Sequence, residues 1–331
     1  MPHDPSARPT LRLLRALSDG WEDAFQHRAV SEERWDDVQP LSSLRHPILL
    51  KCRNTFEAKP HDRRSRRPIA CSRDLRLEEI RFSQWRAAIW LDDDGVQWIV
   101  AAGRAKGNHE DREDFYEILD RQCSTEEGRD ALLPTDADRN LLKRETAARI
   151  LTDWELSLQP IVARLLENAV TTGRSRTAIP HPIHSRLLTE LELEVAIGAD
   201  VEEFVLTFIN HQQPGSPLAY ALERRLLISI APPEQDWDVG SGIYAAMEAP
   251  GHAQSQIGEL RRAVDENRLL ESTPGQSAHR AHRRHIGDAA VSGRALRALC
   301  GVFFVPRTDP EKLPCCTECE QTYNSLPPIR S

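Results

Sequence analysis

The sequence predicts an α+β protein with a small antiparallel sheet and N-terminal helices, a helical middle domain and a cysteine-rich tail. Three observations lead to this prediction. Strand-like apolar runs flank the turn sequence at residues 92–95 (DDDG), as in a β-hairpin. Apolar residues recur at helical spacing through much of 140–211. Four of the seven cysteines lie at or after residue 300.

The length of 331 residues allows two or three domains, and we expect boundaries that give residues 1–123, 124–250 and 251–331. Apolar residues make up 40% of the chain and charged residues 28%, which is typical of a soluble globular protein. No apolar run approaches the roughly 20 residues that span a bilayer. The first residues lack the pattern of a signal peptide. A cytoplasmic protein without membrane partners is therefore expected.

The formal net charge of −8 argues against a protein coated in positive charge for nucleic acid. The charges are unevenly distributed, however. Arginine and lysine crowd residues 51–86 and 261–297, whereas acidic residues dominate 110–138 and 190–203. Local basic faces therefore remain compatible with the composition.

In the first domain, the apolar spacing of Leu14, Leu17, Trp21 and Phe25 predicts helical structure over residues 11–34. The short apolar run at residues 46–51 (HPILLK) predicts a strand. An extended segment is expected at 75–82, and the two strands of the hairpin at 84–91 and 96–102. A helix is expected to begin near residue 115.

In the rest of the chain, residues 124–140 have the composition of an acidic linker. A helix is predicted over 140–171, with Pro160 beginning a new helix or bending this one. Residues 185–197 and 201–211 are predicted as two amphipathic helices, and 220–230 as a further helix. Residues 231–257 carry little regular pattern, and 257–270 predict a short charged helix.

The cysteines of the tail have the spacing of a metal site. Cys316 and Cys319 form a C-x-x-C knuckle, and Cys300, followed by glycine, supplies half of a second one. Three thiolates and one imidazole form a closed tetrahedral set for structural zinc, without an open catalytic position. His279, His282 and His285 can supply the imidazole; His285 is favoured, and Cys315 ranks second to Cys316. The alternative is that these are free, buried cysteines.

The tail also carries a longer pattern: His285, the sequence ALCG at 298–301, the sequence VPRTDPEKLP at 305–314, and the final C-x-x-C. Over residues 285–323 this pattern resembles a small actinobacterial zinc-ribbon-like family of unknown function, with Phe304 at a position where tryptophan is more usual. The resemblance implies a bound metal and an interaction role.

Residues 75–119 combine Arg81, Arg86, an Asp-Gly turn, an apolar strand and the sequence GRAK at 103–106. This order resembles the C-terminal half of RelE/HigB-like toxins, especially the phage-derived branch. The resemblance extends over residues 45–120 if the preceding helix and strand belong to it. It implies a RelE-like fold and a metal-independent endoribonuclease. The large, acidic chain departs from those small, basic toxins.

Cleavage of RNA by its own 2′-hydroxyl requires a proton acceptor, positive charge on the phosphate and a donor to the leaving oxygen. The resemblance places these roles on five candidate catalytic residues and one substrate-binding residue: Arg86 and Arg104 as phosphate contacts, Lys106 or His109 for proton transfer, Tyr116 for stacking or donation, and Arg81 as a further phosphate contact. The alternative is that the arginines are solvated strand residues and Lys106 a turn lysine.

Two functions follow from these patterns. The first is a RelE-like endoribonuclease of the toxin or defence type, whose partners are RNA or the ribosome and an antitoxin. The second is a non-catalytic zinc-binding adaptor for nucleic acid or a protein. Residues 279–285 (HRAHRRH) form the most basic part of the tail, and zinc ribbons often present such a face to phosphates.

Overall fold

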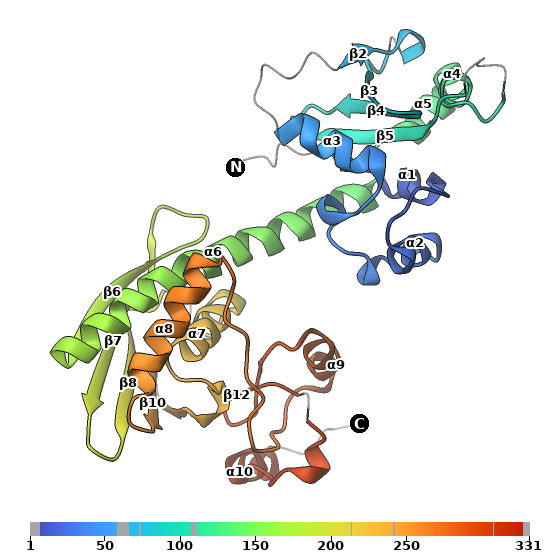
Figure 1. The fold of residues 1–331 in the computed structure, drawn as a ribbon. Coiled ribbons are helices and arrows are strands. Elements are labelled where there is room, and N and C mark those ends of the chain that lie inside the picture. The colour runs from blue at the N-terminus through green and yellow to red at the C-terminus, as the bar shows by residue number, and fades with distance from the viewer. Residues whose placement is uncertain are drawn as a thin grey trace. The chain divides into compact units, whose positions relative to one another are not determined.

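The computed structural model describes residues 7–57, 66–72, 74–106, 111–212, 214–240, 242–306 and 308–326. These residues form helices and mainly antiparallel sheets, which confirms the predicted α+β class. The chain divides into two compact units, Met1–Ala147 and Ala148–Ser331, and each contains its own five-stranded sheet (Figure 1). The three-part division inferred from the sequence stays a prediction.

The sheet of unit 1 has the strand order β1-β5-β4-β3-β2. Its strands are β1 (Arg8–Pro9), β2 (Arg67–Pro68), β3 (Glu78–Phe82), β4 (Trp85–Leu91) and β5 (Gln97–Arg104). β4 and β5 form the predicted hairpin. Its turn is closed by the Asp92 side chain, which accepts a hydrogen bond from the Val96 amide at 2.7 Å, and Gly95 takes a positive φ of 80°.

Helices cover both faces of this sheet. On one face, α1 (Leu11–Ala16), α2 (Ala24–Ser31) and α3 (Pro47–Glu57) bury Leu14 and Ile48 against Ile80 and Ile99 of the strands. On the other, α4 (Phe115–Cys123) buries Phe115 and Leu119 against Trp98. Alternate residues along the central strands therefore point into two different cores.

Three predictions for unit 1 were wrong in detail. Residues 46–51 begin α3 and form no strand, because Pro47 occupies the first turn and Ile48, Cys52 and Phe56 recur at four-residue steps into the core. Residues 11–34 form two helices with a break between them. The expected linker contains α5 (Glu126–Leu132) and the beginning of α6 (Asp136–Thr172), with Thr125 as the N-cap of α5.

His46 makes the stability of unit 1 sensitive to acid. It is fully buried, its Nε2 lies 2.9 Å from the Asp19 carbonyl oxygen, and its ring meets Trp21 and Trp85 edge-on. Burial lowers the pKa of His46 from 6.5. The unfolded chain therefore binds a proton that the folded one does not, so stability is full above about pH 6.5 and decreases below it, by up to about 1.4 kcal/mol per pH unit.

Hydrogen exchange of unit 1 measured from pH 7.5 to 5.5 tests this expectation. The decrease in protection on acidification should be smaller in His46→Asn than in the parent chain. It should be as large as in the parent in His27→Asn, which removes a neighbouring histidine of α2. An equal loss in His46→Asn and the parent chain would show that another group controls the transition.

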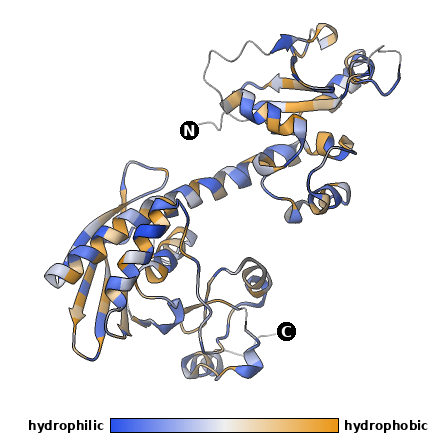
Figure 2. Cartoon of the chain, in the orientation of Figure 1, coloured by the Kyte–Doolittle hydropathy of each residue, from blue (hydrophilic) through white to orange (hydrophobic). Residues whose placement is uncertain are grey.

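The sheet of unit 2 has the strand order β6-β7-β8-β10-β9 and is antiparallel throughout its described pairings. Its strands are β6 (Arg174–Pro180), β7 (Leu187–Ile197), β8 (Glu202–Ile209), β9 (Asp238–Gly240) and β10 (Ile243–Glu248). The prediction of helices at 185–197 and 201–211 was therefore wrong. In β7, Leu191, Leu193 and Val195 alternate with glutamates, which is the two-residue period of a strand; the same banding is visible along the strands in Figure 2.

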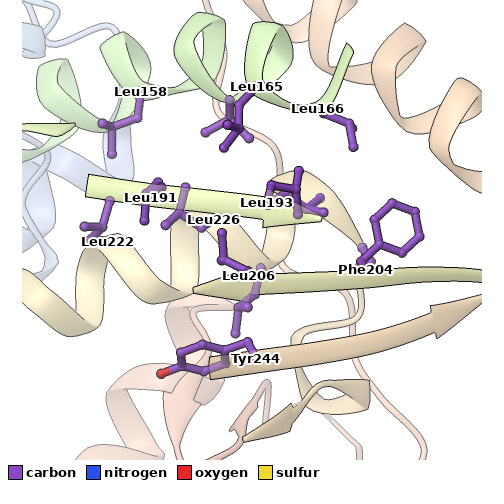
Figure 3. Close-up of a cluster of buried hydrophobic side chains, with 14 of the residues drawn as sticks. Leu158, Leu165, Leu166, Leu191, Leu193, Phe204, Leu206, Leu222, Leu226 and Tyr244 are labelled. Atoms are coloured by element: carbon purple, nitrogen blue, oxygen red, sulfur yellow. The ribbon is translucent and has the colours of Figure 1, made fainter. Parts of the chain in front are cut away.

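Three helices pack against this sheet: the C-terminal part of α6, α7 (Pro217–Ile230) and α8 (His252–Asp265). Leu158 of α6 points toward Leu191 of β7 and Leu165 toward Leu193, and Leu226 of α7 lies beside Leu206 of β8 (Figure 3). Pro160 lies inside the continuous helix α6, so it does not begin a new helix. Residues 231–257, expected to be irregular, contain β9, β10 and the beginning of α8.

The tail belongs to the same unit. It contains α9 (Arg283–Ser292), a two-stranded hairpin of β11 (Leu296–Arg297) and β12 (Phe303–Phe304), and α10 (Thr317–Ser325). Ala295, Phe303 and Val305 are part of the hydrophobic core that the sheet builds with its helices. Among the described residues, no helix is both long and apolar enough to cross a membrane.

Candidate metal centre

The turn of the β11–β12 hairpin presents Cys300. The Ala298 amide donates to the Val302 carbonyl oxygen at 2.7 Å, and the Gly301 amide donates to that of Ala298 at 3.0 Å. Gly301 has φ +97°, a conformation that residues with a side chain rarely adopt. Glycine after Cys300 thus permits the tight turn that directs the thiol toward the interior of the tail.

The first turn of α10 presents the other two thiols. Cys316 is the N-cap of the helix and Cys319 lies one turn later, so both side chains project from the same end. Cys319 is only 1% exposed. The C-x-x-C spacing therefore brings two sulfur atoms together at the helix N-terminus.

A third segment passes between these two structures and carries His279. The Ala278 amide donates to the Pro314 carbonyl oxygen and the Cys316 amide to that of Ala278, each at 2.9 Å. On the other side, the Leu299 amide donates to the Arg280 carbonyl oxygen at 2.7 Å. The backbone on both sides of His279 is therefore fixed to the two cysteine-bearing turns.

One ligand atom from each of His279, Cys300, Cys316 and Cys319 lies within 4.8 Å of the others. The Nδ1 atom of His279 is 3.5 Å from the Cys300 sulfur and 3.7 Å from the Cys319 sulfur. Ligands about 2.3 Å from a tetrahedral ion are about 3.8 Å apart. The group could hold a metal ion, and its donors are those of a closed site.

The predicted cysteines are thus brought together, but the favoured histidine is not. His285 lies on α9, where its exposed ring contacts that of His282, and the imidazole in the group belongs to His279. Cys315 is exposed and outside the group. The backbone hydrogen bonds of residues 278 and 280 explain this choice, because they connect distant parts of the chain.

Burial and hydrogen bonds affect the protonation of the group. Burial lowers the pKa of His279, which favours the neutral imidazole that a metal needs. Burial raises the pKa of the Cys300 thiol to about 12. Burial also opposes ionisation of Cys319, but hydrogen bonds outweigh it and lower its pKa; one comes from the Arg280 amide, 3.4 Å from the sulfur. A bound cation would favour all three thiolates.

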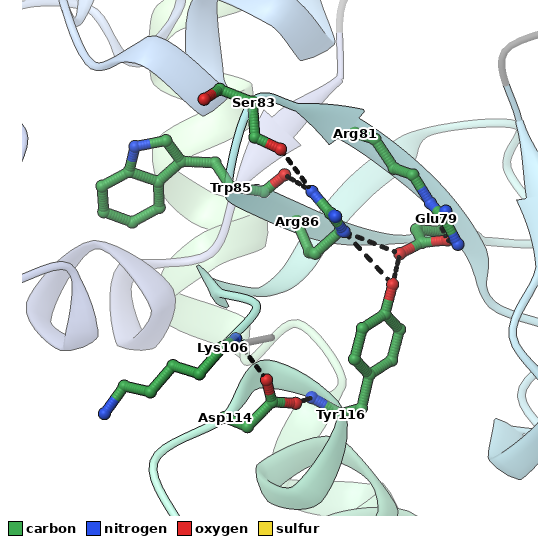
Figure 4. Close-up of polar contacts among 8 residues, drawn as sticks. All are labelled: Glu79, Arg81, Ser83, Trp85, Arg86, Lys106, Asp114 and Tyr116. Atoms are coloured by element: carbon green, nitrogen blue, oxygen red, sulfur yellow. Dashed lines mark hydrogen bonds and ion pairs between the residues drawn. The ribbon is translucent and has the colours of Figure 1, made fainter. Parts of the chain in front are cut away.

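The residues predicted to act on RNA form a different kind of site in unit 1. Arg81, Arg86 and Tyr116 converge on Glu79, a side chain only 4% exposed (Figure 4). Glu79 accepts from Arg81 Nε at 2.7 Å and from the Tyr116 hydroxyl, which in turn accepts from Arg86 Nε at 3.2 Å. Glu79 was not among the residues predicted from the sequence, although its position on β3, two residues before Arg81, places both on the same face of the sheet.

The other predicted residues do not join this group. Lys106 Nζ lies 2.6 Å from Asp111 and 3.1 Å from Glu113. Arg104 pairs with Asp19 at 2.7 Å and lies over the Trp85 ring. His109 lies outside the described residues. The predicted catalytic residues are therefore divided between separate ion pairs.

Residues 271–326 match the model of a family described as a protein of unknown function (DUF3039). Neither the curated proteins nor the solved structures contain a significant match to the chain. The family match lies outside residues 45–120, where the RelE/HigB-like resemblance stays a prediction. By comparison with known proteins, this chain is thus recognised through the segment that carries its metal-ligand group.

Proposed function

We propose that this protein is a non-catalytic zinc-binding adaptor whose tail binds single-stranded RNA. The group formed by His279, Cys300, Cys316 and Cys319 within 4.8 Å carries the proposal. Three thiolates and an imidazole suit zinc in a structural role, because all four tetrahedral positions are filled by protein and none is left for a substrate. Zinc holds the cysteine-bearing turns together, and α9 provides the contact surface.

The binding surface is the α9 basic cluster, which we define as residues 282–285. All four side chains are exposed, and among the described ion pairs none involves Arg283 or Arg284. These arginines occupy the first turn of α9, where the helix dipole disfavours positive charge, and no acidic residue shares that turn. Positive charge in this position is unfavourable, and the described side chains offer it no ion-pair partner, which supports an external anion; phosphates are the anions that arginine binds best.

Salt-dependent binding of a single-stranded oligonucleotide to the zinc-loaded chain tests the proposal. In Arg283→Ala/Arg284→Ala, affinity should decrease for every sequence, and the slope of log K against log salt should become shallower by about 1 per arginine. The matched control is Arg261→Ala/Arg262→Ala on α8, which removes the same charge from arginines paired with Glu167 and Glu259. Equal binding by both double variants would reject α9 as the RNA surface.

Metal-independent RNA cleavage by unit 1 is a second candidate. It is supported by the convergence of Arg81, Arg86 and Tyr116 on Glu79, which combines two cations, a hydroxyl and a carboxylate. In such a site a 2′-hydroxyl would attack the adjacent phosphorus and the 5′-oxygen would leave, with proton transfer by the carboxylate or hydroxyl and charge stabilisation by the arginines. Burial and the bond to Glu79 raise the pKa of Tyr116, which therefore stays protonated and able to donate.

Induced expression with measurement of growth and RNA integrity tests this second function. The parent chain should slow growth and cleave RNA, and Arg81→Ala/Arg86→Ala should do neither, with a loss of about 100-fold or more in cleavage. Lys143→Ala/Arg144→Ala removes the same charge from exposed positions of α6 and should behave as the parent. If all three chains are harmless and leave RNA intact, the nuclease proposal fails and the adaptor remains.

A further inference from the structure

A cavity of about 420 Å³ lies in unit 2, among the ends of β8 and β10, the helix α7 and the β11–β12 hairpin. It is distinct from the ligand group of the metal centre. Phe208, Tyr244 and Val239 contribute apolar surface, and Glu223 and Arg297 contribute charge. Its volume is in the range of about 300–1,000 Å³ that is typical of small-molecule sites. A mostly apolar wall with a few converging polar groups is also the usual composition of such a site.

The polar part of the cavity contains a carboxylate oxygen that lacks a hydrogen bond. Glu223 is 7% exposed; the Tyr244 hydroxyl donates to its carboxylate, but the Oε2 atom has no hydrogen-bond partner among the described residues. Arg297 Nη1 lies 3.8 Å from this oxygen, which is within ion-pair range but too far for a hydrogen bond. Leaving a buried acceptor unsatisfied is unfavourable. A ligand with N–H donors would satisfy Glu223.

Arg297 is held beside this oxygen by contacts of its own. Its Nε donates to the Gly301 carbonyl oxygen at 3.1 Å, and its guanidinium lies 4.8 Å from the centre of the Tyr220 ring. These contacts fix the side chain while Nη1 faces Glu223. The cavity therefore presents an acceptor and a donor next to each other, on a carboxylate and a guanidinium whose positions are set by the fold.

The apolar part of the cavity is aromatic. The ring of Phe208 is stacked with that of His211, with centroids 5.6 Å apart and an interplanar angle of 22°. Tyr244 meets Phe208 edge-on. Burial lowers the pKa of His211, so its ring is neutral near pH 7. Flat aromatic ligands bind well to such walls, because their faces stack on the rings.

We propose that this cavity binds a guanine base. Guanine has an acceptor, O6, directly beside two donors, N1–H and the N2 amino group. The Oε2 atom of Glu223, whose lone pairs have no partner among the described residues, accepts from the two donors, Arg297 donates to O6, and the aromatic side chains cover the face of the base. Adenine would place an acceptor, N1, opposite the carboxylate. The site is separate from the α9 basic cluster, so the proposal goes beyond RNA binding by the tail and does not rest on it.

Calorimetric titration of the zinc-loaded full chain with nucleoside monophosphates tests which base the cavity binds. GMP should bind saturably, and IMP, which lacks the N2 amino group, about tenfold more weakly. AMP should show no saturable binding. Glu223→Gln keeps the shape of the side chain and should weaken GMP binding about tenfold, whereas Glu203→Gln at an exposed position of β8 should bind GMP as the parent does. Equal affinity for GMP and AMP, or an unchanged Glu223→Gln variant, would overturn the proposal.

The same base can come from a free nucleotide or from an RNA strand, and two oligonucleotides distinguish these sources. An oligouridine with one central guanosine should bind more tightly than plain oligouridine, and Glu223→Gln should remove that difference if the source is a strand. GMP binding without such a difference identifies the free nucleotide. Arg283→Ala/Arg284→Ala should weaken both oligonucleotides and leave GMP binding unchanged, so failure at α9 and failure at the cavity are separable. Absence of both GMP binding and the guanosine preference rejects the cavity site.

Discussion

Replacing Cys316 and Cys319 together with serine is expected to remove about one zinc ion per chain and to unfold most of the tail, while the unit 2 sheet stays folded. Zinc content by elemental mass spectrometry and amide protection by hydrogen exchange measure the two effects. Protection should disappear from residues 276–292 and 310–326, and persist in β7 and β8 and in the β11–β12 hairpin, which packs on the core of unit 2. Because the ligands come from three separate segments, loss of the ion releases all three at once.

The expected effect is large because little else holds these segments together. Among the side chains that the structure describes, the hydrophobic cluster around the ligands has three buried members, those of Ala298, Phe304 and Cys319. Structural zinc contributes about 10–16 kcal/mol in small zinc-finger peptides, which exceeds what so few apolar side chains can supply. The packing of Phe303 and Val305 into the core of unit 2 anchors the hairpin, but it does not reach α10.

Single substitutions show whether the loss of zinc is specific to the cysteines and the histidine of the ligand group. Cys315→Ser should retain zinc, because Cys315 is exposed and lies outside the ligand group. His279→Ala should weaken zinc binding, and His285→Ala should not. Full zinc content in Cys316→Ser/Cys319→Ser would reject the metal centre, and a loss of zinc in His285→Ala but not in His279→Ala would restore the ligand that the sequence favoured.

The difference between His285 and His279 indicates what the sequence could determine about the metal centre. Cysteine spacing alone selected Cys300, Cys316 and Cys319, because a C-x-x-C knuckle is a local feature. The histidine depends on where residues 278–280 pass between two turns, and the hydrogen bonds that set this path join residues far apart in the sequence. Neither the distance along the chain nor the local composition encodes that path.

The secondary structure shows the same limit: features set by a few neighbouring residues could be predicted, and those set by distant contacts could not. The β4–β5 hairpin was predictable because Asp92 and Gly95 form its turn within a few residues. In β7, leucine and glutamate have high helix propensity, which favoured the wrong assignment. The strand is stabilised from outside: Arg174 and Arg176 of β6 pair with Glu192, and the leucines of β7 pack against α6. Cross-strand partners of this kind override local propensity.

Glu155→Ala is expected to destabilise unit 2 by about 3–5 kcal/mol, the usual cost of removing one partner from a buried ion pair. Glu155 of α6 is 7% exposed, and its carboxylate lies 3.0 Å from Arg224 and 3.3 Å from Arg225 of α7. Burial lowers the pKa of Arg225, although the nearby Glu155 opposes this. Hydrogen exchange in α7 and β8 measures the change without interference from unit 1.

Two comparisons distinguish the effect of leaving a buried charge unpaired from the effect of shortening a side chain. Glu259→Ala breaks an exposed pair with Arg262 on α8 and should cost less than about 1 kcal/mol. Adding Arg225→Met to Glu155→Leu should recover part of the stability lost in Glu155→Leu, because the buried guanidinium is removed together with its partner; the Leu270 carbonyl oxygen, which accepts from Arg225 Nη1 at 2.7 Å, loses that bond. If Glu155→Ala costs no more than Glu259→Ala, or if the double variant is the least stable chain, then α6 and α7 are held together by their leucines and the ion pair contributes little.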